Sequence, residues 1–235
     1  MAKTPGRVGV KTRLAPVLAP EARSRLARAL LDDRIEQLTR IPGLDPHLAH
    51  TGTPPPQAAP ASPPIPGFPQ RGEGLGARLI HAAATLFARG YGRVMLVDAD
   101  SPLVPDQTFV AATVALERVD VVVGPSDDGG YYLIGMRTPQ PSLFRDVPFS
   151  TAEVLTVTRS RAREAGLETY LLPATYDIDE PADLERLRMD LADGPARWPR
   201  ADGGETKAEG APHPRHLTAW LQAWGDGSVT SRVVR

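Results

Sequence analysis

The chain has 235 residues, of which 41% are hydrophobic and 23% are charged, so it can bury a core and is not wholly disordered. Its 27 lysines and arginines nearly balance its 28 aspartates and glutamates, and a net charge of −1 disfavours a broad nucleic-acid interface. The sequence contains no cysteine, which excludes disulfides, thiolate metal sites and cysteine catalysis. No apolar run is long enough for a membrane span or a signal peptide, so we expect a cytoplasmic protein without a membrane partner.

Helical and strand patterns alternate along the chain. Helices are predicted at residues 21–39, 75–89, 105–117, 150–166 and 180–191, the fourth opened by a capping box of Ser150 and Glu153. Strands are predicted at residues 47–51, 93–98, 119–124, 131–136 and 167–172. Two of these strands are nearly continuous apolar runs, which is typical of strands covered on both faces. The alternation predicts an α/β fold with a mainly parallel sheet between helices.

Proline is unusually frequent in this chain, which contains 25 of them. Residues 51–70 are too rich in proline for a helix or a central strand. Residues 193–215 are typical of a linker, and a short helix is predicted after it at 216–224. We therefore expect one domain over residues 1–192 and an appendage over residues 193–235.

Acidic residues gather near the predicted strand ends, where open α/β sheets bind ligands. Asp98 and Asp100 end a buried strand, and Asp177 and Asp179 precede a helix with the same spacing. Alternate residues of an extended backbone face the same way, so Asp98 and Asp100 could bind one Mg²⁺ or Mn²⁺ ion. The alternative is that these residues only cap turns and helices, with Asp179 as a helix N-cap.

A basic loop precedes the first predicted helix. Residues 2–16 carry Lys3, Arg7, Lys11 and Arg13 among glycines and prolines, a composition that suits a bound polyphosphate. The alternative is a frayed basic N-terminus. A second open loop, which leads to Gly76, would also meet a ligand.

The segment 124–135 reads GPSDDGGYYLIG. Gly129 and Gly130 allow close approach to a ligand, and Tyr131 could stack on a ring or bond a hydroxyl group. The adjacent Asp127 and Asp128 could act as a base. The alternative is an ordinary hairpin turn, because Asp-Gly is a strong turn signal.

Six motifs occur in a familiar order: AKTPGRVGVKTRLAP, QRGEGLGARL, DADSPLVP, GPSDDGGYYLIG, VPFST and DIDEPADL. Over residues 1–190 the chain resembles a family of small bacterial GT-A-type glycosyltransferase-like proteins, some linked to arsenosugar-type biosynthesis and related to guanylyl- and cytidylyltransferases. The resemblance implies a nucleotide-diphospho-sugar transferase-like three-layer sandwich. Two features depart from the family: the strand before the basic loop is missing, and Phe149 stands where tryptophan is commoner.

The resemblance also implies roles for individual residues. It assigns the nucleotide phosphates to Lys3, Lys11 and Arg13, and the acceptor side to Asp128, Gly129, Gly130 and Tyr131. It assigns the metal ion to Asp98 and Asp100, completed by Asp177 or Asp179.

Three functions remain open at this point. The first is a metal-dependent glycosyltransferase, in which Arg13 and the metal stabilise the leaving diphosphate and Asp127 or Asp128 activates a small acceptor. The second is a nucleotidyltransferase, in which a phosphate or phosphonate acceptor attacks a nucleoside triphosphate and pyrophosphate leaves. The third is a degenerate relative that binds nucleotide without catalysis. An unpaired sheet edge would favour a homo-oligomer.

Overall fold

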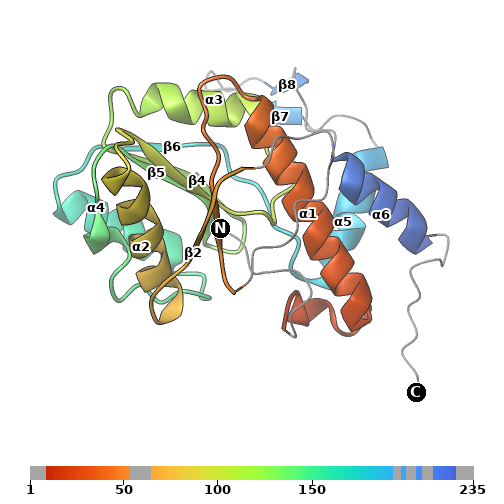
Figure 1. Cartoon of the computed structure of the whole chain (residues 1–235). Helices are drawn as coiled ribbons and strands as arrows, with labels where there is room; N and C mark the ends of the chain where they lie inside the picture. The colour runs from red at the N-terminus through yellow and green to blue at the C-terminus, as the bar shows by residue number, and fades with distance from the viewer. Residues whose placement is uncertain (1–8, 53–64, 193–196, 200–204, 208–213, 226–235) are drawn as a thin grey trace. The chain divides into compact units, whose positions relative to one another are not determined.

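The computed structural model describes residues 9–52, 65–192, 197–199, 205–207 and 214–225 (Figure 1). The chain forms two compact units, each assembled from separate chain segments. We call residues 69–98 and 107–176 the sheet unit. The helical unit consists of residues 2–68, 99–106 and 177–235, of which only the described ones are considered below.

A four-stranded sheet forms the centre of the sheet unit, with the strand order β3-β5-β4-β6. The strands are β3 (Val94–Val97), β4 (Val121–Pro125), β5 (Tyr131–Met136) and β6 (Thr169–Leu171). The helices that accompany them are α2 (Gly74–Ala88), α3 (Asp106–Ala115), α4 (Val154–Glu164) and the 3-10 turn η2 (Pro141–Leu143). Val121, Val122 and Val123 are at most 1% exposed, as expected for an apolar strand covered on both faces.

Strand direction differs in one respect from the expectation of a mainly parallel sheet. β4 and β6 pair in parallel, but β5 runs antiparallel to both β3 and β4 and lies between them. Val121 therefore faces Met136 on one side and Thr169 on the other. The cause is the short link between β4 and β5, because only a hairpin can join two strands over five residues.

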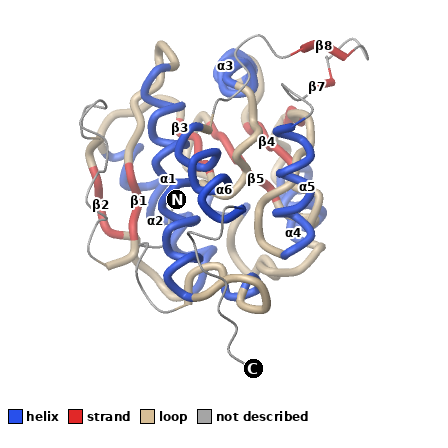
Figure 2. Tube along the Cα trace, turned by 90° about the vertical axis from the view of Figure 1, so that its right-hand side faces the viewer, coloured by secondary structure: helices blue, strands red, loops and turns tan. Residues whose placement is uncertain are grey.

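The sheet unit has three layers. In Figure 2 the sheet lies between α2 and α4, and Figure 1 shows the same arrangement from the side of α2. α2 packs on β3, and α4 packs on β6 and η2.

The helical unit is built around the long helix α1 (Pro20–Arg40). It also contains η1 (Thr12–Leu14), α5 (Pro181–Ala192), α6 (Arg215–Gly225), the paired strands β1 (Leu48–His50) and β2 (Gly67–Pro69), and the antiparallel pair β7 (Arg197–Pro199) and β8 (Glu205–Lys207). Leu31, Leu48, Ile65 and Ala99 form one apolar cluster beside Ile35.

The last described helix, α6, is fastened to α1. The Asp33 carboxylate accepts hydrogen bonds from the backbone N–H groups of His216 (3.0 Å) and Leu217 (2.8 Å), which are unsatisfied donors of the first helical turn. Leu217 is fully buried and Trp220 is 6% exposed. Burial raises the pKa of Asp33, although these two hydrogen bonds oppose the rise. The segment expected to form a short helix thus docks through a tertiary cap.

The helix boundaries agree with the sequence to within a few residues, with one correction at α4. The expected capping box is wrong: Ser150 has a φ of 72°, whereas an N-cap residue needs an extended backbone. The helix begins at Val154, and its N-cap residue Glu153 forms no side-chain cap. No described helix is both long and apolar enough to cross a bilayer. The division expected at residue 192 stays a prediction.

Candidate functional site

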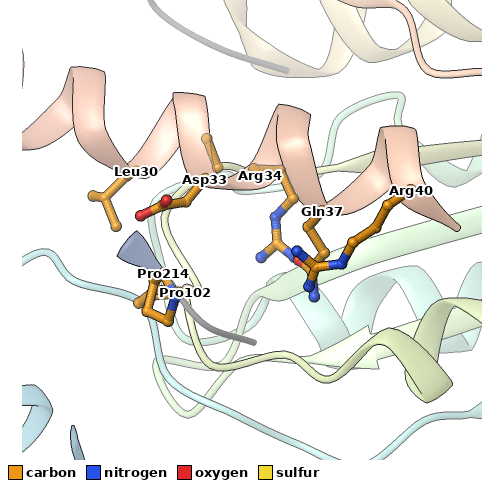
Figure 3. A pocket seen from close by; sticks show the side chains of 8 residues that line it. Leu30, Asp33, Arg34, Gln37, Arg40, Pro102 and Pro214 are labelled. Carbon is orange, nitrogen blue, oxygen red and sulfur yellow. The ribbon is translucent and has the colours of Figure 1, made fainter. Parts of the chain in front are cut away.

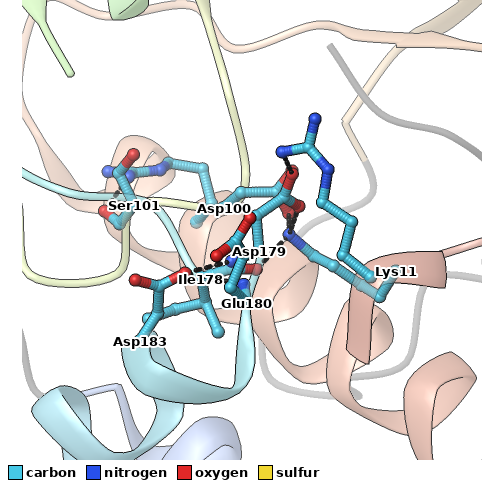
Figure 4. Close-up of polar contacts among 9 residues, drawn as sticks. Lys11, Asp100, Ser101, Ile178, Asp179, Glu180 and Asp183 are labelled. Atoms are coloured by element: carbon cyan, nitrogen blue, oxygen red, sulfur yellow. Dashed lines mark hydrogen bonds and ion pairs between the residues drawn. The ribbon is translucent and has the colours of Figure 1, made fainter. Parts of the chain in front are cut away.

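Two acidic segments far apart in the sequence lie side by side in the helical unit. The backbone N–H of Ile178 donates a hydrogen bond of 2.9 Å to the carbonyl oxygen of Asp100. This bond brings the side chains of Asp100 and Asp179 to the same place (Figure 4). Both carboxylates remain partly exposed, at 43% and 38% of the side chain, so a ligand from solvent can reach them.

The ammonium group of Lys11 lies between these carboxylates. Its Nζ atom is 3.0 Å from Asp100 Oδ1 and 3.2 Å from Asp179 Oδ1, and it donates a hydrogen bond of 2.5 Å to the carbonyl oxygen of Ile178. The Lys11 side chain is only 4% exposed. Burial alone would lower the pKa of Lys11, but the two carboxylates outweigh it and the pKa lies above its ordinary value. Lys11 is therefore a fixed positive charge.

The backbone of Lys11 is strained to reach this position. Its φ of 49° and ψ of 48° place it in the left-handed region, immediately before η1. For a residue other than glycine this conformation costs about 1–3 kcal/mol, which persists only where surrounding contacts enforce it. The three contacts of Nζ supply that enforcement.

Arg13 adds a second positive charge on the solvent side. Its Nη1 atom lies 3.2 Å from Asp179 Oδ2, while its side chain is 55% exposed. Asp179 thus contacts a buried cation through one oxygen and an exposed cation through the other. We call Lys11, Arg13, Asp100 and Asp179 the charge cluster.

The alternative that Asp179 caps α5 is wrong. The backbone N–H groups of Asp179 (3.0 Å) and Glu180 (2.6 Å) donate to Asp183 Oδ2, one turn into the helix. Asp183 is thus the residue that reaches back to the helix start, as the acidic member of a capping box does. The Asp179 carboxylate instead contacts Lys11 and Arg13.

The segment around Asp128 forms the hairpin turn that joins β4 and β5. The N–H of Ser126 donates to the carbonyl of Gly130 at 3.1 Å, and Asp128 Oδ1 accepts from the N–H of Gly130 at 2.9 Å. A Cβ atom at Gly129 would lie 2.3 Å from the carbonyl oxygen of Ala152, and φ there is +85°. The turn therefore requires glycine for steric reasons. Asp127 and Asp128 are both exposed, and a role toward an acceptor stays a prediction.

Gly76 and Tyr131 also have structural explanations in the sheet unit. A Cβ atom at Gly76 would lie 2.4 Å from the carbonyl oxygen of Phe144. The Tyr131 hydroxyl is buried, and burial raises the pKa of Tyr131, an effect that the neighbouring Thr158 hydroxyl only partly offsets. Ligand contacts by either residue stay predictions.

The remaining candidates are distributed over both units. Asp98 directly follows β3 in the sheet unit, and its N–H donates to the carbonyl of Tyr132 at 2.9 Å. Asp177 belongs to the helical unit and is partly buried. Lys3 and Arg7 fall outside the described residues. The charge cluster is therefore the part of the predicted site that the structure brings together.

The donor set of the charge cluster suits a hard divalent cation. Mg²⁺ and Mn²⁺ prefer carboxylate oxygens, and Asp100 and Asp179 offer them at a partly exposed position. Lys11 and Arg13 already balance the charge of these two carboxylates. A divalent ion would leave excess positive charge here unless an anion entered with it.

A different group of potential metal ligands has a structural role. Asp33, Glu36 and His216 bring one ligand atom each within 4.8 Å of one another. Asp33 caps α6 with both oxygens, and Glu36 Oε2 lies 2.9 Å from Arg215 Nε and 3.6 Å from His216 Nε2. These contacts fasten α6 to α1.

Sequence reasoning missed two buried polar residues of α1. Arg34 and Gln37 are only 5% and 4% exposed. At helical spacing they continue the apolar face that Leu26 and Leu30 begin. Two polar residues on the face expected to be buried could have identified them from the sequence.

Comparison with known proteins places the chain among its relatives. The family model described as "Uncharacterized protein conserved in bacteria (DUF2064)" matches residues 34–151. The chain is 30% identical to the 2-phospho-L-lactate guanylyltransferase of Haloarcula marismortui over 203 residues, which cover 85% of this chain and 90% of the relative. It is 32% identical to the enzyme of the same name from Halomicrobium mukohataei over 213 residues, which cover 85% and 91%.

A solved structure supports the same fold. A candidate nucleotide-diphospho-sugar transferase from Desulfovibrio desulfuricans G20 superimposes with a TM-score of 0.73 at 28% identity, covering 95% of both chains. This confirms the expected α/β fold of the nucleotide-diphospho-sugar transferase type. Because the matched segment spans half of the sequence, the chain belongs to the bacterial protein family DUF2064.

Proposed function

We propose that the protein is a metal-dependent nucleotidyltransferase, which transfers a nucleotidyl group from a nucleoside triphosphate to a small acceptor that carries a phosphate or phosphonate. The observation that carries this proposal is the charge cluster. Its two cations and two carboxylates are joined by three ion pairs with N–O distances of 3.0, 3.2 and 3.2 Å. The two guanylyltransferases that are 30% and 32% identical to the chain support the same reaction class.

Charge balance explains how donor and metal would bind. The charge cluster is neutral without ligands, because each carboxylate has a cation beside it. A triphosphate alone would bring negative charge close to Asp100 and Asp179, and a divalent ion alone would bring positive charge close to Lys11 and Arg13. We therefore expect the two to bind together, with much weaker binding of either one alone.

The residues would divide the work as follows. Arg13 is the exposed cation and would contact the phosphates first, as a charge-assisted donor. Lys11 would hold the carboxylates in place and oppose the negative charge that develops on the leaving pyrophosphate. Asp100 and Asp179 would hold the metal ion, whose contribution is to neutralise phosphate charge. An acceptor oxygen forms the new bond to the α-phosphorus, and the bond to the oxygen that bridges the α- and β-phosphates breaks.

An anionic acceptor removes the need for a protein base. A phosphate monoester with a second pKa near 6 already exposes an ionised oxygen at neutral pH. Electrostatic stabilisation, which the charge cluster can supply, is then the main requirement. In this reaction Asp127 and Asp128 would serve the hairpin turn rather than proton transfer.

Glycosyl transfer is the second candidate. The similarity to the nucleotide-diphospho-sugar transferase from Desulfovibrio desulfuricans favours it, at a TM-score of 0.73. The metal and Arg13 would then stabilise a leaving nucleoside diphosphate, and Asp127 or Asp128 would have to activate an acceptor hydroxyl group.

Binding and product analysis separate the two candidates. Calorimetry with each of the four nucleoside triphosphates and with nucleotide sugars, with and without Mg²⁺ or Mn²⁺, identifies the donor. The proposal expects tight binding of one triphosphate only with metal, and pyrophosphate release with phosphorylated acceptors such as 2-phospholactate. Preferred binding of a nucleotide sugar and release of a nucleoside diphosphate would replace it with glycosyl transfer.

Matched variants test the site itself. Arg13→Ala should weaken binding of the metal–nucleotide complex by roughly 1.5–3 kcal/mol, as for a lost charge-assisted contact. Arg188→Ala is the control, since Arg188 is an exposed arginine that pairs with Glu185 on α5. Asp179→Asn should abolish the metal dependence of binding, whereas Glu185→Gln should not. Equal effects of site and control variants would remove the charge cluster from the nucleotide site.

A further inference from the structure

Three polar side chains of α1 hold the loop that follows Asp100. Arg34 donates through Nη2 to the carbonyl oxygen of Ser101 at 2.5 Å, and through Nη1 to Gln37 Oε1 at 2.5 Å. Gln37 donates to the carbonyl oxygen of Val104 at 2.7 Å and to Asp106 Oδ1 at 2.8 Å. Arg40 contacts both oxygens of Asp106 at 3.1 Å. We call Arg34, Gln37 and Arg40 the polar row.

The polar row contacts the loop through hydrogen bonds and an ion pair. A small pocket lies beside these contacts, lined by α1 residues and Pro102 (Figure 3). A buried guanidinium costs free energy that a leucine at the same position would not. Arg34 is nevertheless buried, with only 5% of its surface exposed, and Ser101 is fully buried. Apolar packing alone therefore does not explain why an arginine occupies this position.

The contact at Ser101 is one residue away from the charge cluster. The carbonyl of Ser101 accepts from Arg34, and the carbonyl of Asp100 accepts from Ile178, whose carbonyl in turn accepts from Lys11. The peptide between Ser101 and Pro102 is therefore held from α1, while the peptide between Asp100 and Ser101 is held from the segment that carries Asp179. Arg34 is the side chain that binds the Ser101 carbonyl at 2.5 Å, while the backbone N–H of Val104 reaches the same oxygen at 3.5 Å.

We propose that Arg34 is a positioning residue for the proposed nucleotide site, which acts by holding the Ser101 carbonyl and thereby keeps the Asp100 carboxylate beside Asp179. The inference rests on the proposed function for its consequence in binding. The structural part of the proposal is that Arg34 stabilises the hydrogen bond between Ile178 and Asp100, and this part does not depend on that function. Gln37 supports it by accepting from Arg34 and by closing the same loop at Val104.

Amide hydrogen exchange tests the structural content without any ligand. Arg34→Met should increase the exchange rate of the Ile178 amide and of the amides of Ser101, Leu103 and Val104 by about tenfold, through local opening. The control is Arg28→Met, because Arg28 lies on the same helix but pairs with Asp32 of that helix at 2.6 Å. Equal exchange of these amides in the two variants would overturn the proposal. If Arg34→Met does not fold, Arg34→Lys decides: it supports the proposal if these amides exchange faster than in the unchanged protein, and overturns it if they do not.

A binding cycle tests the consequence for the site. Arg34→Met should weaken binding of the metal–nucleotide complex by about tenfold, as removal of residues that orient metal ligands commonly does. In an Asp100→Asn background the same substitution should change the affinity by less than about twofold, because Arg34 acts through Asp100. Equal losses in both backgrounds would show a general structural role and overturn the proposal. If the unchanged protein binds no nucleotide, the proposed function fails, and the exchange experiment still decides the role of Arg34.

Discussion

Replacing Lys11 by methionine tests whether its charge holds the two acidic segments together. Methionine keeps an unbranched apolar side chain and removes the ammonium group, so the change isolates the charge. Asp100 and Asp179 would then face each other without the cation that lies 3.0 Å and 3.2 Å from them. We expect a loss of unfolding free energy rather than a gain.

The size of the loss follows from Coulomb's law. Removal of the ammonium group forfeits its attraction to the two carboxylates, which at 3.0 Å and 3.2 Å is roughly 1.3 kcal/mol each in water and about four times that at an effective dielectric constant of 20. Both carboxylates are about 40% exposed, so screening by water reduces the upper figure. The variant also avoids the cost of burying the ammonium group. We therefore expect a net loss of about 1–3 kcal/mol.

Urea unfolding at pH 7 measures this loss, and a double variant checks its origin. In Lys11→Met combined with Asp100→Asn, one carboxylate is neutral, so about half of the lost free energy should return. Because the pKa of Lys11 is raised, its contribution is fully present below its unfolded-state pKa near 10.4 and is lost only as the pH rises through the higher folded-state value. Strictly additive effects of the two substitutions would refute the reasoning.

Three further predictions concern single residues. Gly129→Ala should cost more than about 2 kcal/mol in thermal unfolding, because its Cβ would meet the Ala152 carbonyl at 2.3 Å, whereas Gly130→Ala, with a nearest contact of 3.1 Å to a side chain, should cost much less. Asp183→Ala should destabilise the protein by about 1 kcal/mol in urea, since two N–H groups at the start of α5 lose their acceptor; no loss would argue against this cap. The pKa of Asp33 is raised, so its contribution to the unfolding free energy should fall as the pH rises from 3.8 through the folded-state value. Asp33→Asn should abolish that component when unfolding is measured from pH 3.5 to pH 7, and an unchanged pH dependence would contradict it.

Local patterns predicted most of the fold because they report directly on burial and backbone preference. The apolar runs at β3 and β4 and the helical spacing of α1 need no tertiary information. The capping box at Ser150 failed because the chain places that residue at a φ of 72°, which residue type alone does not reveal. The antiparallel β5 was within reach, since the Asp-Gly turn and the short link already favoured a hairpin.

The candidate site was predictable in composition but not in arrangement. Alternate spacing selected Asp100 and Asp179 together with Asp98 and Asp177. The composition of the first loop selected Lys11 and Arg13, and the structure brings these two cations to Asp100 and Asp179. Which of them would contact one another depends on the hydrogen bond between Ile178 and Asp100, which only the folded chain shows. Their roles in metal and phosphate binding stay predictions until nucleotide binding is measured.

The contacts between α6 and α1 connect the last described helix to the part of α1 that holds the loop after Asp100. Asp33 and Glu36, which hold α6, are sequence neighbours of Arg34 and Gln37, which hold the loop after Asp100. A protein shortened to end before Pro214 would uncover the surface that Leu217 and Trp220 occupy and leave Asp33 without its two donors. Trimming a terminus to aid crystallisation or tagging would in this protein disturb α1, and through it the acidic pair.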